Sequence, residues 1–256
     1  MNWGSVAGAS SYQVVLTGPS GTKTYSFAGS PQFIPDSDMS AAGAYTATVQ
    51  AISNNPAYLN GPASDSSTPM TVLNKVAKPT WTTDTGIINW VDVDNETSYT
   101  VTLLKDGAPL ETVTKTAGSI SHPFGGTIAL NGAGNYSVTV QAINSGTDYI
   151  DGLASDASEE RTVVQLDLGA DPWWGGITGH VIYWNNIDNE TGYQVILKKD
   201  GNVVECQNIE STTAYWYDFD YRMNGVTGSF TVDVKALGNG TNYANSIPRT
   251  SAAHVH

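Results

Sequence analysis

The chain has 256 residues, a formal net charge of −13 and only 14% charged residues. Such an acidic chain lacks the basic surface that displaces counterions from phosphates, which excludes nucleic acid as an expected partner. The single cysteine, Cys206, excludes an intramolecular disulfide, and without an apolar run of about 18 residues we expect no membrane insertion.

Strand patterns begin at the first residues of the chain. Trp3 is followed nine positions later by Tyr12, and residues 45–51 read Tyr-x-Ala-x-Val-x-Ala. An alternation of apolar and polar residues is typical of an antiparallel strand with one buried face and one wet face. This region therefore predicts a β-structure rather than helices.

The same pattern returns twice further along the chain. Trp90 and Trp184 each precede a tyrosine by nine positions, and the alternating segment recurs at 136–142 and 230–236. Internal repetition of this kind predicts three copies of one supersecondary unit. We expect repeat 1 at residues 1–73, repeat 2 at 74–165 and repeat 3 at 166–256.

Tight turns separate the strand patterns within each repeat. Asp106-Gly107 follows the strand pattern that begins at Tyr99, and Asp200-Gly201 has the same place in repeat 3. Asp-Gly between alternating segments is a strong hairpin signal. Several short strands joined by such turns within about 90 residues indicate a β-sandwich.

These landmarks resemble the B, C and F strands of fibronectin type III domains. Leu130, six residues before Tyr136, matches the leucine that this family places before its F strand, and Met39 has that place in repeat 1. Repeat 3 departs from the family, with Met223 seven residues before Phe230. The resemblance implies an all-β chain of three tandem fibronectin type III-like β-sandwiches, elongated and joined by short linkers.

Repeat 1 has only two residues before Trp3, so we expect it to lack its first strand, the A strand. Repeats 2 and 3 have residues for that strand at 76–83 and 166–174. One interpretation is that the chain is a fragment of a longer protein. The other is that the open edge of repeat 1 accepts a strand from another chain by strand exchange.

A metal site is at best weakly indicated. Asp92, Asp94 and Glu96 place three carboxylates in one loop, as calcium prefers, but Thr97 stands where a calcium loop needs glycine. A solvated loop is the favoured interpretation. His254-x-His256 is read as a frayed tail.

Residues 215–222 of repeat 3 have no counterpart in the other repeats. If the segment is extended, Trp216, Asp218, Asp220 and Arg222 share one face opposite an all-aromatic face. Trp173 is the other tryptophan outside the repeat pattern. An exposed indole beside hydrogen-bonding groups suits the stacking of a sugar ring, so these five residues form a candidate glycan site. The alternative is that the aromatics fill a wider core or the contact between repeats.

Three functional hypotheses follow, and none is an enzyme. We find no catalytic motif and expect no cofactor. The first hypothesis is a structural or adhesive spacer, the second a carbohydrate-binding module carried by repeat 3, and the third a self-assembling surface filament or phage virion accessory subunit. The lack of disulfides and the tyrosine-containing loops at 146–149 and 240–243 resemble secreted surface proteins of Gram-positive bacteria. We therefore expect an extracellular or cell-surface location and a glycan or another surface protein as partner.

Overall fold

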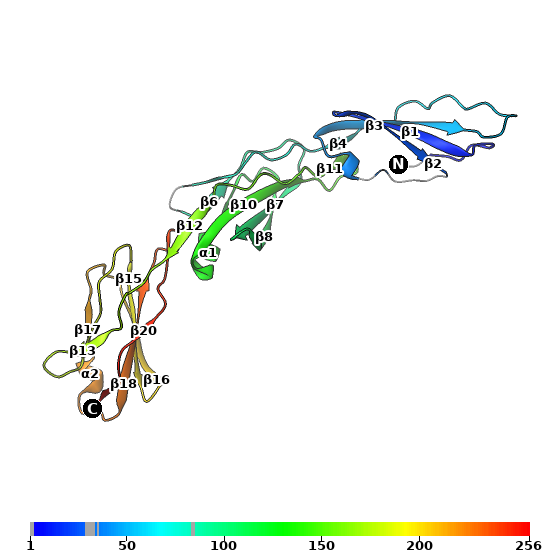
Figure 1. Cartoon of the computed structure of the whole chain (residues 1–256). Helices are drawn as coiled ribbons and strands as arrows, with labels where there is room; N and C mark the ends of the chain where they lie inside the picture. The colour runs from blue at the N-terminus through cyan, green and yellow to red at the C-terminus, as the bar shows by residue number, and fades with distance from the viewer. Residues whose placement is uncertain (1–2, 29–33, 35, 83–84) are drawn as a thin grey trace.

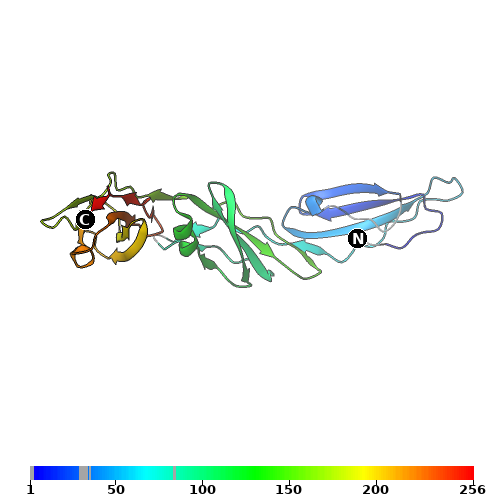
Figure 2. The ribbon, with the colours of Figure 1, turned by 90° about the horizontal axis from the view of Figure 1, so that it is seen from below.

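The computed structural model describes residues 3–28, 34, 36–82 and 85–256. Three β-sheet units follow one another along an elongated, bent chain (Figures 1 and 2). The fold is all-β, as expected, and its three tandem units keep the names repeat 1, repeat 2 and repeat 3.

Repeat 1 contributes four strands, which form one sheet with β11 of repeat 2 in the order β11-β4-β3-β1-β2. Its elements are β1 (Ser11–Gly18), β2 (Gly21–Phe27), the 3-10 helix η1 (Asp36–Asp38), β3 (Gly43–Ile52) and β4 (Met70–Val72).

Repeat 2 is a full sandwich with sheets β5-β6-β9 and β12-β10-β7-β8. Its elements are β5 (Thr80–Trp81), β6 (Ile87–Asn89), β7 (Ser98–Lys105), β8 (Ala108–Thr116), β9 (Ser121–Pro123), α1 (Gly125–Asn131), β10 (Gly134–Ile143), β11 (Tyr149–Ile150) and β12 (Arg161–Gln165).

Repeat 3 has the same two layers, β13-β14-β17 and β16-β15-β18, with β20 and β21 both on β18. Its elements are β13 (Trp173–Gly175), β14 (Val181–Tyr183), β15 (Gly192–Lys199), β16 (Asn202–Ile209), β17 (Trp216–Asp218), α2 (Asp220–Met223), β18 (Ser229–Leu237), β19 (Tyr243–Ala244), β20 (Arg249–Thr250) and β21 (His254–Val255).

The predicted hairpin turns are present. Asp106 and Gly107 both have positive φ, at 50° and 79°, and join β7 to β8. Asp200 and Gly201 repeat these angles at 51° and 81° between β15 and β16. Two successive left-handed residues match the twist of the flanking strands, which explains the Asp-Gly pair at both sites.

Each repeat has its own core, built from alternate residues of the long strands. Trp90 and Tyr99 pack edge to face at 5.7 Å in repeat 2, and Trp184 and Tyr193 pack at 5.3 Å in repeat 3. The apolar residues at 136–142 and 230–236 are all fully or almost fully buried. The two-residue period of the sequence therefore reports one buried face in each of these strands.

Leu130, which the sequence matches to the leucine before the F strand, lies outside the core of repeat 2. This side chain is 89% exposed, whereas Ile128 in the same helix, α1, is fully buried in the core of repeat 2. The helical backbone between β9 and β10 changes which residue points inward, because positions two apart do not share a face of a helix. In repeats 1 and 3, Met39 and Met223 are buried, although Met223 stands seven residues before its strand residue Phe230 rather than six.

Among the described residues, repeat 1 has no A strand, which agrees with the expectation. Its described strands form a single sheet, and its core is correspondingly less closed. Val49 and Ala51 on β3 are partly exposed, while their counterparts Val140 and Ala142 on β10 are fully buried under the β5-β6-β9 sheet.

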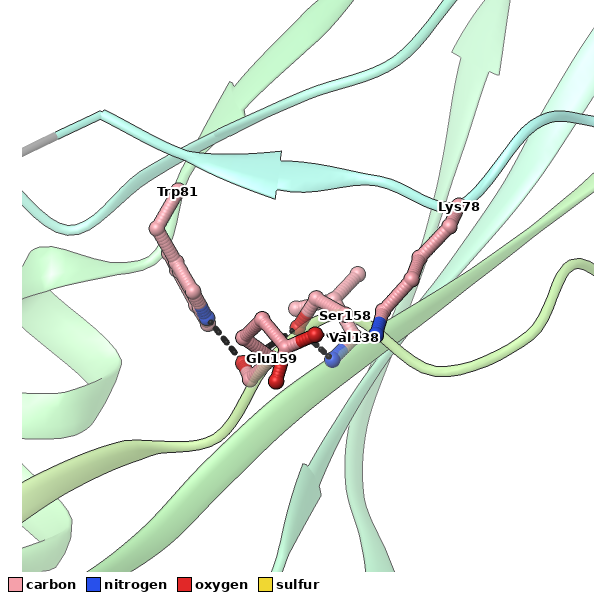
Figure 3. Close-up of polar contacts among 5 residues, drawn as sticks. All are labelled: Lys78, Trp81, Val138, Ser158 and Glu159. Carbon is pink, nitrogen blue, oxygen red and sulfur yellow. Dashed lines mark hydrogen bonds and ion pairs between the residues drawn. The ribbon is translucent and has the colours of Figure 1, made fainter.

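The first strand of repeat 2 is held by a tryptophan. Trp81 on β5 donates its indole N–H to the carbonyl oxygen of Glu159 at 3.0 Å, and Lys78 forms an ion pair with the Glu159 carboxylate (Figure 3). Ser158 accepts the N–H of Val138 on β10 through its hydroxyl oxygen at 3.0 Å (Figure 3). The segment before β12 is thus joined to both sheets of the sandwich.

Repeat 3 has the same indole hydrogen bond, whereas repeat 1 has only the serine hydrogen bonds of this arrangement. Trp174 donates to the carbonyl oxygen of Ala252 at 3.0 Å. In repeat 1, Ser67 accepts the N–H of Ala47 at 3.1 Å, and its own hydroxyl donates to the carbonyl oxygen of Thr68 at 2.9 Å. Among the described residues, no indole from a first strand reaches Thr68.

Candidate functional site

The three carboxylates of the calcium candidate do not converge. The Asp92 carboxylate accepts the Tyr99 hydroxyl at 2.6 Å, and the Glu96 carboxylate accepts the N–H of Gly118 at 3.0 Å. Asn186 accepts the Tyr193 hydroxyl at 2.9 Å in the same place in repeat 3, without a charge. Within the described ranges, no group of His, Cys, Asp and Glu side chains has the arrangement of a metal site.

The Asp92 contact is instead structural. The Tyr99 hydroxyl also accepts the N–H of Val93 at 2.8 Å, so one phenol fixes the loop between β6 and β7. Burial and the hydrogen bond to Asp92 together raise the pKa of Tyr99 far above its ordinary value. The phenol therefore stays protonated and keeps donating to the carboxylate.

The aromatic segment of repeat 3 is extended only in part. Trp216, Tyr217 and Asp218 form β17, and the chain then turns into α2 at Phe219. The turn is fixed by the Asp218 carboxylate, which accepts the N–H of Asp220 at 2.8 Å. The expectation of one continuous strand through Arg222 is therefore wrong.

Three aromatic residues form one rung on the outer face of the β13-β14-β17 sheet. Trp173 pairs with Tyr183, and Tyr183 pairs with Trp216. Residues directly opposite each other in a sheet share a face, so all three side chains stand on the same side. Trp173 and Trp216 are 48% and 50% exposed, and the Trp173 and Tyr183 rings are 6.1 Å apart and within 17° of parallel. We call Trp173, Tyr183 and Trp216 the aromatic row.

The fold does not require aromatics at these positions. The neighbouring rung, Trp174–Ile182–Tyr217, faces the core of repeat 3, and its equivalent in repeat 2 is Trp81–Ile88–His122. The rung of repeat 2 that corresponds to the aromatic row is Thr80–Asn89–Ser121, which is entirely polar. The same sheet thus exists with a polar outer rung.

The predicted polar partners lie apart from one another. Asp218 is on the outer face beside the aromatic row, whereas the Asp220 carboxylate, 44% exposed, lies 2.8 Å from Nδ1 of the buried His180. Arg222 pairs with the Glu205 carboxylate at 2.9 Å and lies over the Tyr221 ring. The structure therefore brings Trp173, Trp216 and Asp218 together on one sheet and separates them from Asp220 and Arg222. Tyr183 completes the site, and its register could not be predicted from the sequence.

The two C-terminal histidines, His254 and His256, are held by strand pairing and by ring contacts. His254 lies on β21 opposite Phe230, and its ring is 5.2 Å from that of Trp174. His180 lies 6.2 Å from His254 and 4.7 Å from His256, measured between ring centroids. The interpretation of His254-x-His256 as a frayed tail is therefore wrong.

The repeats are joined by short parallel strand pairs. In the first junction β11 of repeat 2 pairs with β4 of repeat 1, and in the second junction β19 of repeat 3 pairs with β12 of repeat 2. In both cases a loop tip, Tyr149–Ile150 or Tyr243–Ala244, lies along the last strand of the preceding repeat.

Each loop tip also inserts a side chain into its neighbour. Ile150 packs against the core of repeat 1, and Ala244 is buried in the core of repeat 2. Arg161 strengthens the second junction by donating to the carbonyl oxygen of Thr241 and to the Asn242 side chain, both at 2.8 Å. The repeated tyrosine of these loops was visible in the sequence, but its partner strand was not.

A hollow of about 420 Å³ lies beside the second junction. Arg249 forms ion pairs there with Asp167 at 3.1 Å and with Asp171 at 3.6 Å. The lining residues are Gln165, Leu166, Asp167, Ile247, Pro248 and Arg249. The guanidinium is thus already neutralised by two carboxylates.

Comparisons with known proteins return structures of tandem fibronectin type III domains. The FN1–FN3 domains of chicken CNTN1 match 97% of this chain and 89% of their own length at 15% identity and a TM-score of 0.32. A two-domain fibronectin type III segment of chicken tenascin matches 72% of this chain and 99% of its own at 10% identity and a TM-score of 0.30. No family model matches the sequence, and no curated protein does. None of the described helices has the length and apolar character that a membrane crossing requires.

Proposed function

We propose that the chain is a non-catalytic spacer and interaction array of a bacterial extracellular or cell-surface protein. The observation that carries this proposal is the junction geometry. Two successive junctions each use a parallel strand pair and an inserted apolar side chain, although the second pairing lies two residues further along its strand. Both contacts stiffen an elongated chain against bending between repeats.

The charged groups singled out in the sequence support a structural role. The carboxylate of Asp92 accepts from a buried tyrosine, and Arg222 pairs with Glu205. Each of these groups is already engaged in holding a loop or a helix in place.

The spacer function is tested by the distribution of distances between repeat 1 and repeat 3 in solution. Spin labels placed in repeats 1 and 3 of the full chain, at Lys23→Cys and Glu210→Cys in a Cys206→Ser background, should give one narrow distance distribution at low protein concentration. A broad distribution, as expected for repeats on flexible linkers, would contradict the proposal.

A second function, glycan binding by repeat 3, is supported by the aromatic row. Neighbouring strands of a sheet lie about 4.8 Å apart, so Trp173 and Trp216 are separated by roughly 10 Å across Tyr183. This separation suits two sugar rings of an extended glycan, with the indoles covering apolar ring faces. The Asp218 carboxylate beside the row accepts hydrogen bonds from sugar hydroxyls.

Repeat 2 supplies a matched control for this function. The triple variant Trp173→Thr, Tyr183→Asn, Trp216→Ser carries the residues that repeat 2 has on the equivalent rung, so the sheet should still fold. On a glycan array, the unmodified chain should bind extended polysaccharides and the triple variant should lose at least ten-fold in affinity. Equal binding by both would exclude the aromatic row as the site.

A further inference from the structure

Repeat 1 carries a loop tip of the same kind, and no strand of the described residues pairs with it. Tyr58 and Leu59 align with Tyr149–Ile150 and Tyr243–Ala244, seven and eight residues after the last alanine of the alternating strand. Tyr58 is 56% exposed and Leu59 is 94% exposed. In the other two repeats the residue equivalent to Leu59 reaches the core of the preceding repeat.

The loop of repeat 1 nevertheless has the docked shape. The Asn60 side chain accepts the N–H of Ser53 at 3.0 Å, and Gly61 donates its N–H to the carbonyl oxygen of Ala51 at 3.0 Å. The docked loops contain the same two bonds. In repeat 2, the Asp151 side chain accepts a backbone N–H at 2.9 Å and Gly152 donates its N–H to a carbonyl oxygen at 3.0 Å. In repeat 3, Asn245 and Ser246 make the equivalent bonds, both at 2.9 Å. A loop already held in its bound shape loses little conformational entropy on binding.

The opposite end of the molecule presents the matching strand. His256 exchanges backbone hydrogen bonds with Gly228 as its equivalent Val72 pairs with Gly43, so Val255 and His256 correspond to Thr71 and Val72. In the first junction, Thr71 and Val72 are the residues that pair with β11, whereas the second junction pairs two positions further along its strand. The C-terminal strand therefore offers the register of the first junction.

The outer edge of this strand is available. β21 pairs with β18 on one side, no described strand pairs with its other edge, and Val255 is 78% exposed. The loop that carries Tyr58 and the C-terminal strand lie at opposite ends of the elongated chain (Figure 1). The loop tip of one copy therefore cannot reach the C-terminal strand of the same copy, whereas it can pair with the C-terminal strand of a second copy.

Charge does not oppose this contact. The chain as a whole has a net charge of −13, so two copies repel each other at most surfaces. Residues 52–64, which form the loop, contain no charged side chain, and neither do residues 251–256. The two ends are thus neutral patches on an acidic molecule.

We propose that Tyr58–Leu59 of one copy docks in parallel on Val255–His256 of a second copy, with Leu59 inserted into the end of repeat 3. The contact joins two different surfaces and does not close on itself, so it generates open head-to-tail fibres. The proposal rests on the junction geometry that also supports the spacer function, and it names the partner of that array as another copy of the chain.

Sedimentation velocity over a concentration series tests the contact on the full chain. The unmodified chain should associate with rising concentration, and Leu59→Asp should weaken the association at least ten-fold by placing a charge against an apolar core. Ile120→Asp, at a 54% exposed site of repeat 2 away from both ends, should associate like the unmodified chain. A monomer at every concentration would overturn the proposal. Association that survives Leu59→Asp would also overturn it and would point to the open sheet of repeat 1.

The register is tested by cross-linking in a Cys206→Ser background. Tyr58→Cys combined with Val255→Cys should give a ladder of disulfide-linked multimers, because paired residues of neighbouring strands bring their Cβ atoms within disulfide reach. Ile120→Cys combined with Val255→Cys is the control. A ladder no stronger than that of the control would overturn the register. A narrow distance distribution in the monomer would still support the spacer function, so the two failures are distinguishable.

Discussion

Trp81 and Arg161 connect the interior of repeat 2 to its contact with repeat 3. The Arg161 guanidinium lies 5.9 Å from the centre of the Trp81 ring, while the same side chain donates to the carbonyl oxygen of Thr241 across the junction. Trp81 in turn donates to Glu159, two residues before Arg161. Trp81, which holds the first strand of repeat 2, therefore also lies against the Arg161 guanidinium that binds repeat 3.

Replacing Trp81 by Phe should destabilise repeat 2 by about 1 kcal/mol, because the hydrogen bond to Glu159 is lost while most of the ring remains. Urea unfolding of the full chain measures this effect. Trp173→Phe, at a 48% exposed position of repeat 3, should change stability by less than about 0.5 kcal/mol. Equal effects of the two changes would show that the indole N–H of Trp81 contributes nothing.

Replacing Arg161 by Ala should loosen the second junction without unfolding either repeat. Two hydrogen bonds to repeat 3 are lost, one to a backbone carbonyl and one to the Asn242 side chain. Spin-label distances between repeats 2 and 3 should broaden. Arg161→Lys should give an intermediate width, because an ammonium keeps the charge but not the planar fork. An unchanged distribution in Arg161→Ala would mean that the strand pair alone sets the geometry.

The long strands and their turns could be predicted because their signals are local. The alternation at 136–142 reports a buried face, and Asp106-Gly107 reports two left-handed residues. The missing first strand of repeat 1 followed from the same alignment. These features depend on residues close together in sequence, so the sequence contains the whole signal.

The aromatic row and the junctions could be predicted only in part. Trp173 and Trp216 were both recognised as unusual, but they share a rung through Tyr183, which belongs to another strand. Register between distant strands is a non-local property, and a shift of one residue would place these side chains on the opposite face. The tip Tyr149–Ile150 likewise pairs with a strand about 78 residues earlier, as the partners Tyr149 and Thr71 show.

Gly152 and Gly61 form a matched pair that tests the first junction. A Cβ on Gly152 would lie 2.7 Å from the carbonyl oxygen of Asn74 and 3.2 Å from that of Leu73, so Gly152→Ala should push the loop away from the segment that follows β4. The expected cost is about 1–3 kcal/mol, with faster hydrogen exchange at the N–H of Thr71. A Cβ on the equivalent Gly61 meets only Ala51 at 3.8 Å. Gly61→Ala should therefore be neutral in the dilute monomer, and a loss equal to that of Gly152→Ala would contradict this account.

Acid should weaken the end of repeat 3 before it affects repeat 1, which contains no histidine. Burial first, and then repulsion from His180 and His256, lower the pKa of His254 in the folded state. Unfolding frees His254 to bind a proton at its ordinary pKa of about 6.5, so its contribution to stability is full above that pH and falls as the pH drops below it.

The measurement is hydrogen exchange at the N–H of His256, which donates to Gly228, between pH 7.5 and pH 5 after correction for the intrinsic rate. Protection should fall with pH in this window, where Glu205 is still ionised because the tyrosine and arginine beside it hold its pKa below the usual value. His254→Gln should remove most of the pH dependence, because the amide does not titrate. The N–H of Ser67, bonded to Ala47 in repeat 1, is the internal control and should stay constant, because repeat 1 contains no histidine. If both amides lost protection together, the cause would be a general acid effect rather than His254.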